Sequence, residues 1–231
     1  MRLNKFISES GICSRRQADA WIAEGRVRVN GLVAELGTQV GEADSVEVDG
    51  QPVQARKEFV YIALNKPVGI TCTTERHVEG NIIDYVNHPQ RIFPIGRLDK
   101  DSEGLILLTN NGDIVNELLR VENHHEKEYV VTVDRPVEDD FLFGMAHGVD
   151  IIGERTRPCA VRRIGRNAFG IILTQGLNRQ IRRMCAVFDY RVYRLQRVRI
   201  NNITLDGLAK GKWRDLSAAE LRGLLPQRTR W

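Results

Sequence analysis

The sequence predicts an α+β protein with a small N-terminal module and a larger second domain. The chain has 231 residues, of which 42% are hydrophobic, so it can bury a packed core. Strand-like runs outnumber helical ones, and their irregular spacing is typical of an α+β domain rather than of alternating strands and helices. The pattern changes near Glu58, so we expect domains over residues 1–57 and 58–231.

Composition and charge exclude several classes of protein. No apolar run approaches the roughly 20 residues of a membrane span, and the N-terminus has no signal-peptide core. The four cysteines are far apart and form no Cys-x-x-Cys pair, which favours reduced thiols and disfavours zinc. We therefore expect a cytoplasmic protein that contacts no membrane. A net charge of +4 only mildly favours an acidic partner.

The N-terminal module begins with two predicted helices. Leu3, Phe6 and Ile7 recur at helical spacing. Ser14, followed three residues later by Gln17, is typical of a capping box that opens a second helix. An Asn-Gly pair and an Asp-Gly pair, each preceded by alternating valines, then predict two short hairpins.

The charge of this module is polarised, with basic residues in its first half and acidic residues in its second. Arg15 and Arg16 lie in the first turn of a predicted helix, where free backbone N–H groups also attract phosphate. On charge alone, a solvated helix end explains the two arginines equally well. Residues 2–7, 13–18 and 25–31, however, resemble the S4 RNA-binding domain.

The S4 resemblance implies contacts with structured RNA, mostly through phosphate and ribose. The residues that we expect to make these contacts are Arg2, Lys5, Arg15, Arg16, Arg26, Arg28 and Asn30.

In the larger domain, apolar and β-branched runs predict strands, and capping residues delimit the helices. Asp113 can cap one helix, Gly148 can end another, and Ser217 with Glu220 forms a capping box. We expect strands over residues 59–64, 70–74, 92–95, 105–108, 129–133, 160–163, 170–174 and 192–200, and helices over residues 82–86, 113–120, 138–147, 178–188 and 217–225.

A polar loop over residues 96–104 joins two of the predicted strands. It places Asp99 directly after Arg97 and Leu98 on a connection that a rigid scaffold can hold. We interpret the neighbouring acids, Asp101 and Glu103, as solvating and capping groups. A metal site here is disfavoured, because no histidine is spaced to complete it.

The helix predicted over residues 178–188 combines an apolar stripe with three arginines. Arg179 and Arg183 point away from the stripe, toward solvent or a polyanion. Arg182 lies on the flank, where it either pairs with a buried acid or extends to the surface. Further arginines alternate with apolar residues over 191–199, which favours a folded nucleic-acid-binding face over a solvated tail.

Four segments of the larger domain match, in order, the motifs of one enzyme family. They are Lys66-Pro67-Val68-Gly69, residues 96–109, Lys127-Glu128-Tyr129 and residues 175–184. With the S4-like module, the chain resembles the RsuA/RluB/RluE/RluF branch of pseudouridine synthases, and most of all the RluF type. The resemblance implies a mixed, mainly antiparallel β-sheet with flanking helices. It also implies isomerisation of a uridine in ribosomal RNA, and it favours 23S rRNA as the substrate.

The resemblance assigns three catalytic residues. Asp99 is implied to be the nucleophile, which attacks either the ribose or the uracil ring. Arg182 would hold the Asp99 carboxylate ionised, because a nearby positive charge opposes desolvation. Tyr129 would stack on the uracil and assist proton removal. An isomerisation consumes no water and changes no oxidation state, so we expect neither a cofactor nor a metal.

The same resemblance implies a substrate pocket. Leu98 and Ile181 would pack against the base, and Arg97 would help to extrude the uridine from the RNA. Lys66 would touch phosphate or shape its loop, although Lys-Pro before a glycine is also explained as a turn. Arg179 and Arg183 would contact RNA.

Two alternatives to a 23S rRNA synthase remain at this point. One is a synthase that acts on 16S rRNA or tRNA, because the chemistry is shared and specificity lies in loops. The other is a non-catalytic RNA-binding or ribosome-assembly factor, although such a protein would not need Asp99, Tyr129 and Arg182 together. The expected partner is structured rRNA or a large-subunit assembly intermediate, bound by a monomer.

Overall fold

The computed structural model describes residues 1–54, 58–119 and 125–226. The predicted domain limit at Lys57, the helix end at Arg120 and the terminal Trp231 lie outside the described residues. The chain divides into two compact units. The first comprises Met1–Val60 with the short segments His88–Ile92 and Asn110–Gly112, and the second comprises the rest. No helix among the described residues has the length and apolar character needed to cross a bilayer.

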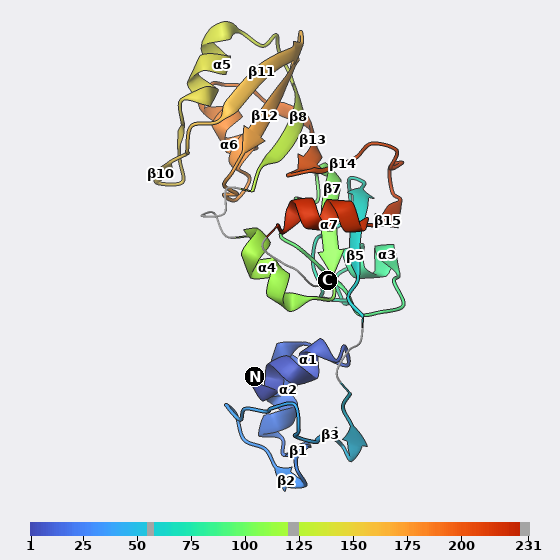
Figure 1. Cartoon of the computed structure of the whole chain (residues 1–231). Helices are drawn as coiled ribbons and strands as arrows, with labels where there is room; N and C mark the ends of the chain where they lie inside the picture. Colours follow the sequence, from blue (N-terminus) through green and yellow to red (C-terminus); the bar gives the residue numbers. More distant parts are fainter. Residues whose placement is uncertain (55–57, 120–124, 227–231) are drawn as a thin grey trace. The chain divides into compact units, whose positions relative to one another are not determined.

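The first unit packs two helices on a small antiparallel sheet (Figure 1). The helices are α1 (Leu3–Glu9) and α2 (Arg15–Ala23), and the strand order is β2 (Leu32–Val33), β1 (Val27–Val29), β3 (Val46–Val48) and β4 (Gln51–Pro52). Its core contains Leu3, Ile7, Cys13, Ala18, Ile22, Val27, Ala34, Val40, Val46 and Val48.

The helix start at Ser14 and both turns predicted for this unit are confirmed. The Ser14 Oγ accepts a hydrogen bond from the Gln17 backbone N–H at 3.1 Å and so opens α2. Both predicted hairpin turns have two consecutive residues with positive φ, as type I′ turns require: +52° at Asn30 and +80° at Gly31, then +51° at Asp49 and +74° at Gly50. The S4-like pattern therefore corresponds to two helices followed by two hairpins.

The second unit is built on one large sheet that is mixed but mainly antiparallel, as predicted. Among the described strands only β7 and β13 pair in parallel. The strand order is β11 (Ala160–Gly165), β12 (Ala168–Leu173), β8 (Lys127–Val133), β13 (Val192–Ile200), β7 (Glu103–Thr109), β5 (Tyr61–Lys66) and β15 (Trp213–Asp215), with β14 (Ile203–Thr204) beside β13 and β6 (Phe93–Pro94) beside β7.

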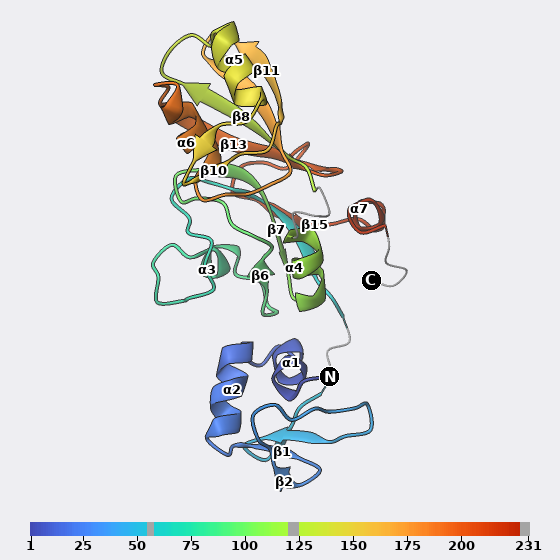
Figure 2. The ribbon, with the colours of Figure 1, turned by 90° about the vertical axis from the view of Figure 1, so that its left-hand side faces the viewer.

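Helices cover this sheet in separate places (Figures 1 and 2). α4 (Gly112–Leu119) and α7 (Ala218–Leu224) share one apolar cluster with β5 and β7, and α7 begins with the predicted capping box of Ser217 and Glu220. α5 (Asp139–Ala146) packs through Phe141 against Phe169 of β12, with ring centroids 5.3 Å apart. The remaining elements are α3 (Ile82–Val86), α6 (Gln180–Val187) and the hairpin of β9 (Asp150–Ile151) and β10 (Glu154–Arg155).

Two expectations about the strands are wrong. β5 continues to Lys66, although polar residues there predicted a break. The strand can continue because the Asn65 side chain donates to the Leu208 carbonyl at 2.9 Å and the Lys66 ammonium also finds carbonyl partners. Residues 70–74 form no strand, and Thr71 makes only an isolated bridge to Asn81.

A glycine at the start of β7 allows an unusually close approach of two strands. Gly104 has a φ of +104° and faces Arg197 of β13. A Cβ atom at this position would lie 2.2 Å from the Arg197 carbonyl oxygen. The absence of a side chain therefore brings β13 against the end of the loop that carries Asp99.

Candidate active site

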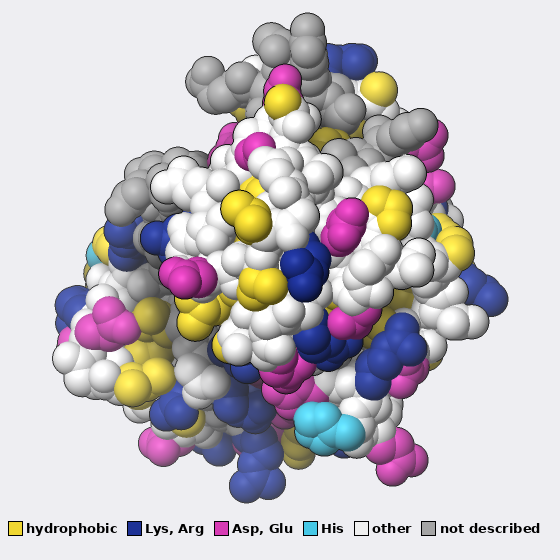
Figure 3. Space-filling view, turned by 90° about the horizontal axis from the view of Figure 1, so that it is seen from below, with side chains coloured by type: hydrophobic (Ala, Val, Ile, Leu, Met, Phe, Trp, Pro, Cys, Tyr) yellow, Lys and Arg dark blue, Asp and Glu magenta, His cyan; other side chains and the backbone are white. Residues whose placement is uncertain are grey.

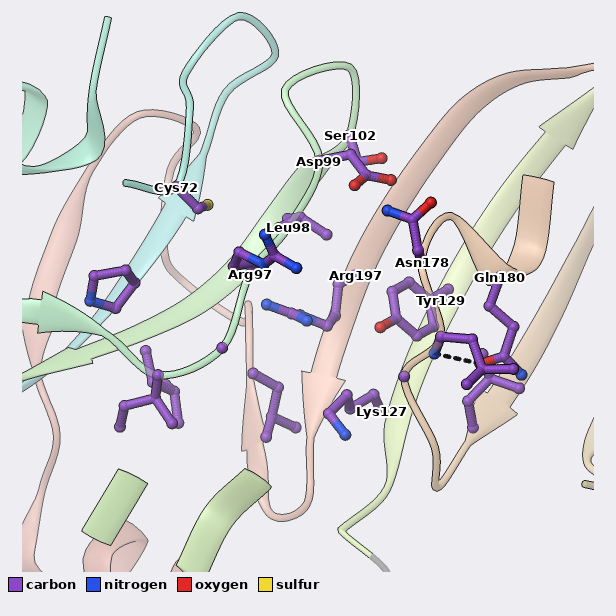
Figure 4. Close-up of a pocket in the computed structure, with 18 of the residues that line it drawn as sticks. Cys72, Arg97, Leu98, Asp99, Ser102, Lys127, Tyr129, Asn178, Gln180 and Arg197 are labelled. Atoms are coloured by element: carbon purple, nitrogen blue, oxygen red, sulfur yellow. Dashed lines mark hydrogen bonds between the residues drawn. The ribbon is translucent and has the colours of Figure 1, made fainter. Parts of the chain in front are cut away.

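A pocket of about 920 Å³ lies beside the loop that carries Asp99. Figure 4 shows that its walls come from this loop, from β8 and β13, and from the segment that precedes α6. These segments are far apart in the sequence and meet because β7, β13 and β8 are neighbours in the sheet. The predicted residues that line the pocket are Arg97, Leu98, Asp99, Tyr129, Arg179 and Ile181.

Asp99 is a half-buried carboxylate on a tight turn. The Ser102 backbone N–H donates to the Asp99 carbonyl at 3.0 Å, which closes the turn. The Asp99 side chain is 34% exposed, and its Oδ2 atom lies 3.8 Å from the Arg179 Nη1 atom. The pocket therefore presents one accessible carboxylate beside a positive charge.

Arg182 was expected to act on Asp99, but the ion pair that it forms among the described residues is with Asp101. The Arg182 Nε atom lies 3.4 Å from Asp101 Oδ2, and its Nη2 donates to the Asp101 carbonyl at 3.0 Å. Its Nη1 donates to the Val192 carbonyl at 3.1 Å. The turn closed by Ser102 presents Asp101, and not Asp99, to Arg182. Arg182 thus fixes the loop that carries the Asp99 carboxylate.

Arg179 is the arginine whose side chain lies within 4 Å of the Asp99 carboxylate among the described residues. It caps the N-terminus of α6 with a left-handed backbone conformation, φ +51°. Its two Nη atoms donate to the two Asp101 carboxylate oxygens at 3.2 and 3.0 Å. Asp101, interpreted from the sequence as a solvating group, therefore joins both arginines to the loop. Burial opposes ionisation of Asp101, but hydrogen bonds from Arg179 and the charge of Arg182 bring its net pKa below the usual range.

Tyr129 lies directly across from Arg197, on the same face of the paired strands β8 and β13. The Arg197 guanidinium carbon lies 6.0 Å from the centre of the Tyr129 ring. Arg197 was expected on an outer nucleic-acid-binding face, but it lines the pocket and is only 4% exposed. The two-residue period of β13 could have revealed this, because Arg197 shares the inward side with Leu195.

The other predicted pocket residues divide into two groups. Leu98 and Ile181 are buried at the pocket wall, and Arg97 lines it with an exposed side chain. Lys66 does not line it: this lysine is fully buried, and its ammonium donates to the Pro67 and Ile70 carbonyls, both at 2.9 Å. Burial lowers the pKa of Lys66. Of its two expected roles, the geometry fits the shaping of the loop.

Acidic partners neutralise much of the arginine-rich strand β13. Glu103 is buried and forms ion pairs with Arg194 and Lys210. Arg199 contacts Glu126 and Glu128, each at 2.9 Å. The charges of Arg194 and Arg199 are therefore balanced in part by acids of the same unit, while Arg191 and Arg194 remain exposed. Arg183, which was also expected to contact RNA, donates through its Nε to the Asn178 carbonyl at 3.1 Å.

In the first unit, several predicted RNA-binding residues have partners within the unit. Arg26 donates to Asp49 and Glu24, Arg28 donates to the Gly31 carbonyl at 2.8 Å, and Lys5 pairs with Glu9. The Asn30 amide donates to Asp44 at 2.8 Å and so supports its turn. Arg2, Arg15 and Arg16 are exposed. Figure 3 shows one face of the molecule, on which Lys and Arg side chains are interspersed with Asp and Glu.

No group of three potential metal-ligating side chains occurs in the part of the chain that the structure describes.

Comparison with known proteins identifies the family. Residues 60–187 match the model for RNA pseudouridylate synthase, and residues 1–46 match the model for the S4 domain. The chain belongs to the RNA pseudouridylate synthase family. Within this family, the synthase is 56% identical over 223 residues to the dual-specificity RNA pseudouridine synthase RluF of Escherichia coli (strain K12), covering 96% of this chain and 77% of the relative.

Further relatives support the assignment along nearly the whole synthase. It is 35% identical to the ribosomal large subunit pseudouridine synthase B of Bacillus subtilis (strain 168), covering 96% of this chain and 95% of the relative. A crystal structure of a pseudouridylate synthase superposes with a TM-score of 0.71 at 29% identity, covering 97% of this chain and 99% of that one. The motifs recognised in the sequence therefore belong to a pseudouridine synthase.

Proposed function

We propose that this synthase converts a uridine of ribosomal RNA, most of all 23S rRNA, into pseudouridine, with Asp99 as its nucleophile. The observation that carries the proposal is the Asp99 carboxylate, which lines the pocket together with Tyr129 and lies 3.8 Å from an Arg179 nitrogen. The name of the Bacillus subtilis relative supports a large-subunit substrate. The RluF relatives are named dual-specificity enzymes, so a second RNA target is part of the test.

A single carboxylate can serve this isomerisation. Asp99 would attack the ribose or the uracil ring and later leave unchanged, so the same group is nucleophile and leaving group. No water is consumed, so the second carboxylate of an inverting glycosidase is unnecessary. Arg179 places a positive charge beside the nucleophile, while Arg182 holds its loop through Asp101.

The substrate base would stack on Tyr129 between apolar walls. Leu98 and Ile181 are buried at the pocket and would exclude water from the reacting atoms. Arg97, exposed at the pocket, would help to displace the uridine from its RNA stack. The N-terminal unit would hold structured RNA through Arg15 and Arg16. We propose that the protein acts as a monomer in the cytoplasm.

The test is a map of pseudouridine in total rRNA and tRNA from cells that lack this gene. The cells are complemented with the wild type, with Asp99→Asn or with Asp140→Asn. Asp140 is a matched control, because it is an exposed aspartate in the first turn of α5. We expect a 23S rRNA position to be lost and then restored by the wild type and by the control, but not by Asp99→Asn.

Other outcomes would change the proposal in distinct ways. A lost position in 16S rRNA or tRNA alone would keep the chemistry and overturn the 23S assignment. Full restoration by Asp99→Asn would refute Asp99 as nucleophile. The absence of any lost position would favour an RNA-binding role in ribosome assembly.

A further inference from the structure

One cationic side chain in the pocket has a hydrogen-bonding group without a partner. Arg197 is 4% exposed, and its Nε donates to the Leu105 carbonyl at 2.6 Å. Its Nη2 atom is buried and has no hydrogen-bond partner among the described residues. Buried polar groups are nearly always paired, so an unpaired donor of a charged group in a pocket calls for an explanation.

A second cation lies on the same side of the sheet. Lys127 precedes Tyr129 by two residues in β8, so both side chains lie on one face, and Arg197 faces Tyr129 across the strand pair. Lys127 and Arg197 both line the pocket (Figure 4). Burial, and after it the charge of Arg197, lowers the pKa of Lys127. Burial and a neighbouring positive charge both indicate that this part of the pocket is shielded from water and positively charged.

We propose that Arg197 Nη2 donates a hydrogen bond to a carbonyl oxygen of the bound uracil and stabilises the negative charge that forms there during isomerisation. The inference rests on the proposed function, because it needs a uridine on Tyr129. A backbone phosphate is a poorer occupant, because it carries the RNA chain on both sides, whereas Arg197 faces the Tyr129 ring on which the base is proposed to stack. A base edge is flat and can enter beside the Tyr129 ring.

Charge reaches the uracil oxygens by either route open to Asp99. If Asp99 bonds to C1′, the N1–C1′ bond breaks and its electron pair stays on the uracil, where N1, O2 and O4 share it. If Asp99 bonds to C6, the pair of the C5–C6 double bond moves toward C4 and O4. In this second route the N1–C1′ bond then breaks as C1′ passes to C5. By either route C5 ends bonded to C1′ and loses its proton, and N1 gains one. Asp99 leaves as a carboxylate, either when C5 displaces it from C1′ or when the C5–C6 double bond re-forms.

The position of Arg197 suits this role. The Leu105 carbonyl anchors its Nε, so the guanidinium is oriented before the substrate arrives. Donors that are fixed in advance in a dry site stabilise developing charge without reorganisation, and removing one costs about 10²- to 10³-fold in rate. Lys127 adds positive charge without a described ion-pair partner of its own.

The test combines protein variants with altered substrates. Single-turnover rates are measured on the RNA fragment identified by pseudouridine mapping, carrying uridine, 2-thiouridine or 4-thiouridine at the target. The enzymes are the wild type, Arg197→Met, Arg197→Lys and the control Arg163→Gln. Arg163 is an exposed arginine of β11 that pairs with Asp139 outside the pocket. Affinity for the RNA and the thermal midpoint are measured for every variant.

We expect Arg197→Met to slow the uridine reaction about 100-fold, as for other lost donors to a developing oxyanion, with RNA affinity changed less than about threefold. The control should match the wild type, and Arg197→Lys should recover part of the rate. Sulfur accepts hydrogen bonds poorly, so thio-substitution at the contacted oxygen should slow the wild type but slow Arg197→Met no further. A structural role alone would not produce this non-additivity.

Additive losses with both thio-substrates would overturn the inference, as would a rate of Arg197→Met within threefold of the wild type. In either case, pseudouridine formation by the wild type would still support the proposed function, so only the inference about Arg197 would fail. If the wild type forms no pseudouridine in any rRNA or tRNA, the proposed function fails and the inference fails with it. If Arg197→Met does not fold, the same cycle is measured with Arg197→Lys, which keeps the charge but changes the donor geometry.

Discussion

Replacing Gly104 with alanine should destabilise the second unit strongly. A Cβ at residue 104 would lie 2.2 Å from the Arg197 carbonyl oxygen and 2.8 Å from its nitrogen. Both atoms belong to a strand backbone that is paired on both sides, so neither can move aside like a flexible side chain. Overpacking of this kind costs about 1–3 kcal/mol. The positive φ of +104° adds about 1–3 kcal/mol for a residue with a side chain.

The two costs together come to about 4 kcal/mol, a large share of the roughly 5–15 kcal/mol that stabilises a typical domain. At about 2–4 °C per kcal/mol for a unit of this size, the thermal midpoint should fall by about 8–16 °C. Circular dichroism melting of Gly104→Ala against the wild type measures this change.

Gly69→Ala separates the two contributions. Gly69 has a φ of +95°, close to that of Gly104, but nothing lies within 4 Å of the position that its Cβ would take. This variant should therefore show only the backbone cost, and the difference between the two variants measures the steric clash. A fall of less than about 3 °C for Gly104→Ala, or equal falls for both, would refute the argument that strand proximity excludes a side chain.

Three further predictions concern RNA binding, the arginines of α6 and pH. Replacing Arg15 and Arg16 with glutamine should weaken RNA binding and reduce the slope of log affinity against log salt by about 1.4–1.8; an unchanged slope in filter binding would remove these residues from the interface. Arg182→Gln should cost about 1–3 kcal/mol in urea denaturation, because the Val192 carbonyl and Asp101 lose donors. Arg179→Gln should cost less than about 1 kcal/mol but slow turnover, since its exposed pair with Asp101 adds little stability; the reverse order would contradict the assigned roles. A hydrogen bond from Arg214 lowers the pKa of Glu220 to about 2 from an ordinary 4.5. This carboxylate stabilises the fold above pH 4.5, and its contribution disappears as pH falls toward 2. The difference in thermal midpoint between wild type and Glu220→Gln should therefore be present at pH 6 and vanish near pH 2, and a constant difference would rule out the ionised pair as its source.

Local signals in the sequence were sufficient for most secondary structure. Turn pairs with positive φ, the caps at Ser14 and Ser217, and the two-residue period of β13 each depend on residues close in the chain. The main failure was β5, because Lys66 and Asn65 are satisfied by partners that only the folded chain supplies. Polarity predicted a break at this point, and tertiary contacts allowed the strand to continue.

The sequence predicted which residues line the candidate site better than it predicted which of them contact each other. Asp99, Tyr129, Leu98 and Ile181 line the pocket, as the motifs implied. Helical spacing could not tell which arginine near α6 lies beside Asp99. Arg179 precedes the helix with a left-handed backbone, so its side-chain direction does not follow the helical period. The two-residue period of β13 places Arg197 on the inward side, but the close approach of β13 to β7 at residue 104 depends on a contact between distant segments.

The link through Asp101 has a consequence for how this enzyme can change in evolution. Asp101 binds Arg179 and Arg182, whose positions are some eighty residues away in the chain. An acid lost at 101 would leave two neighbouring positive charges without their shared counterion, so a later change at one arginine would relieve repulsion rather than add damage. The residues at positions 101, 179 and 182 should therefore vary together among related sequences. A recombinant that takes the loop with Asp101 from one relative and the α6 segment from another should be less fit.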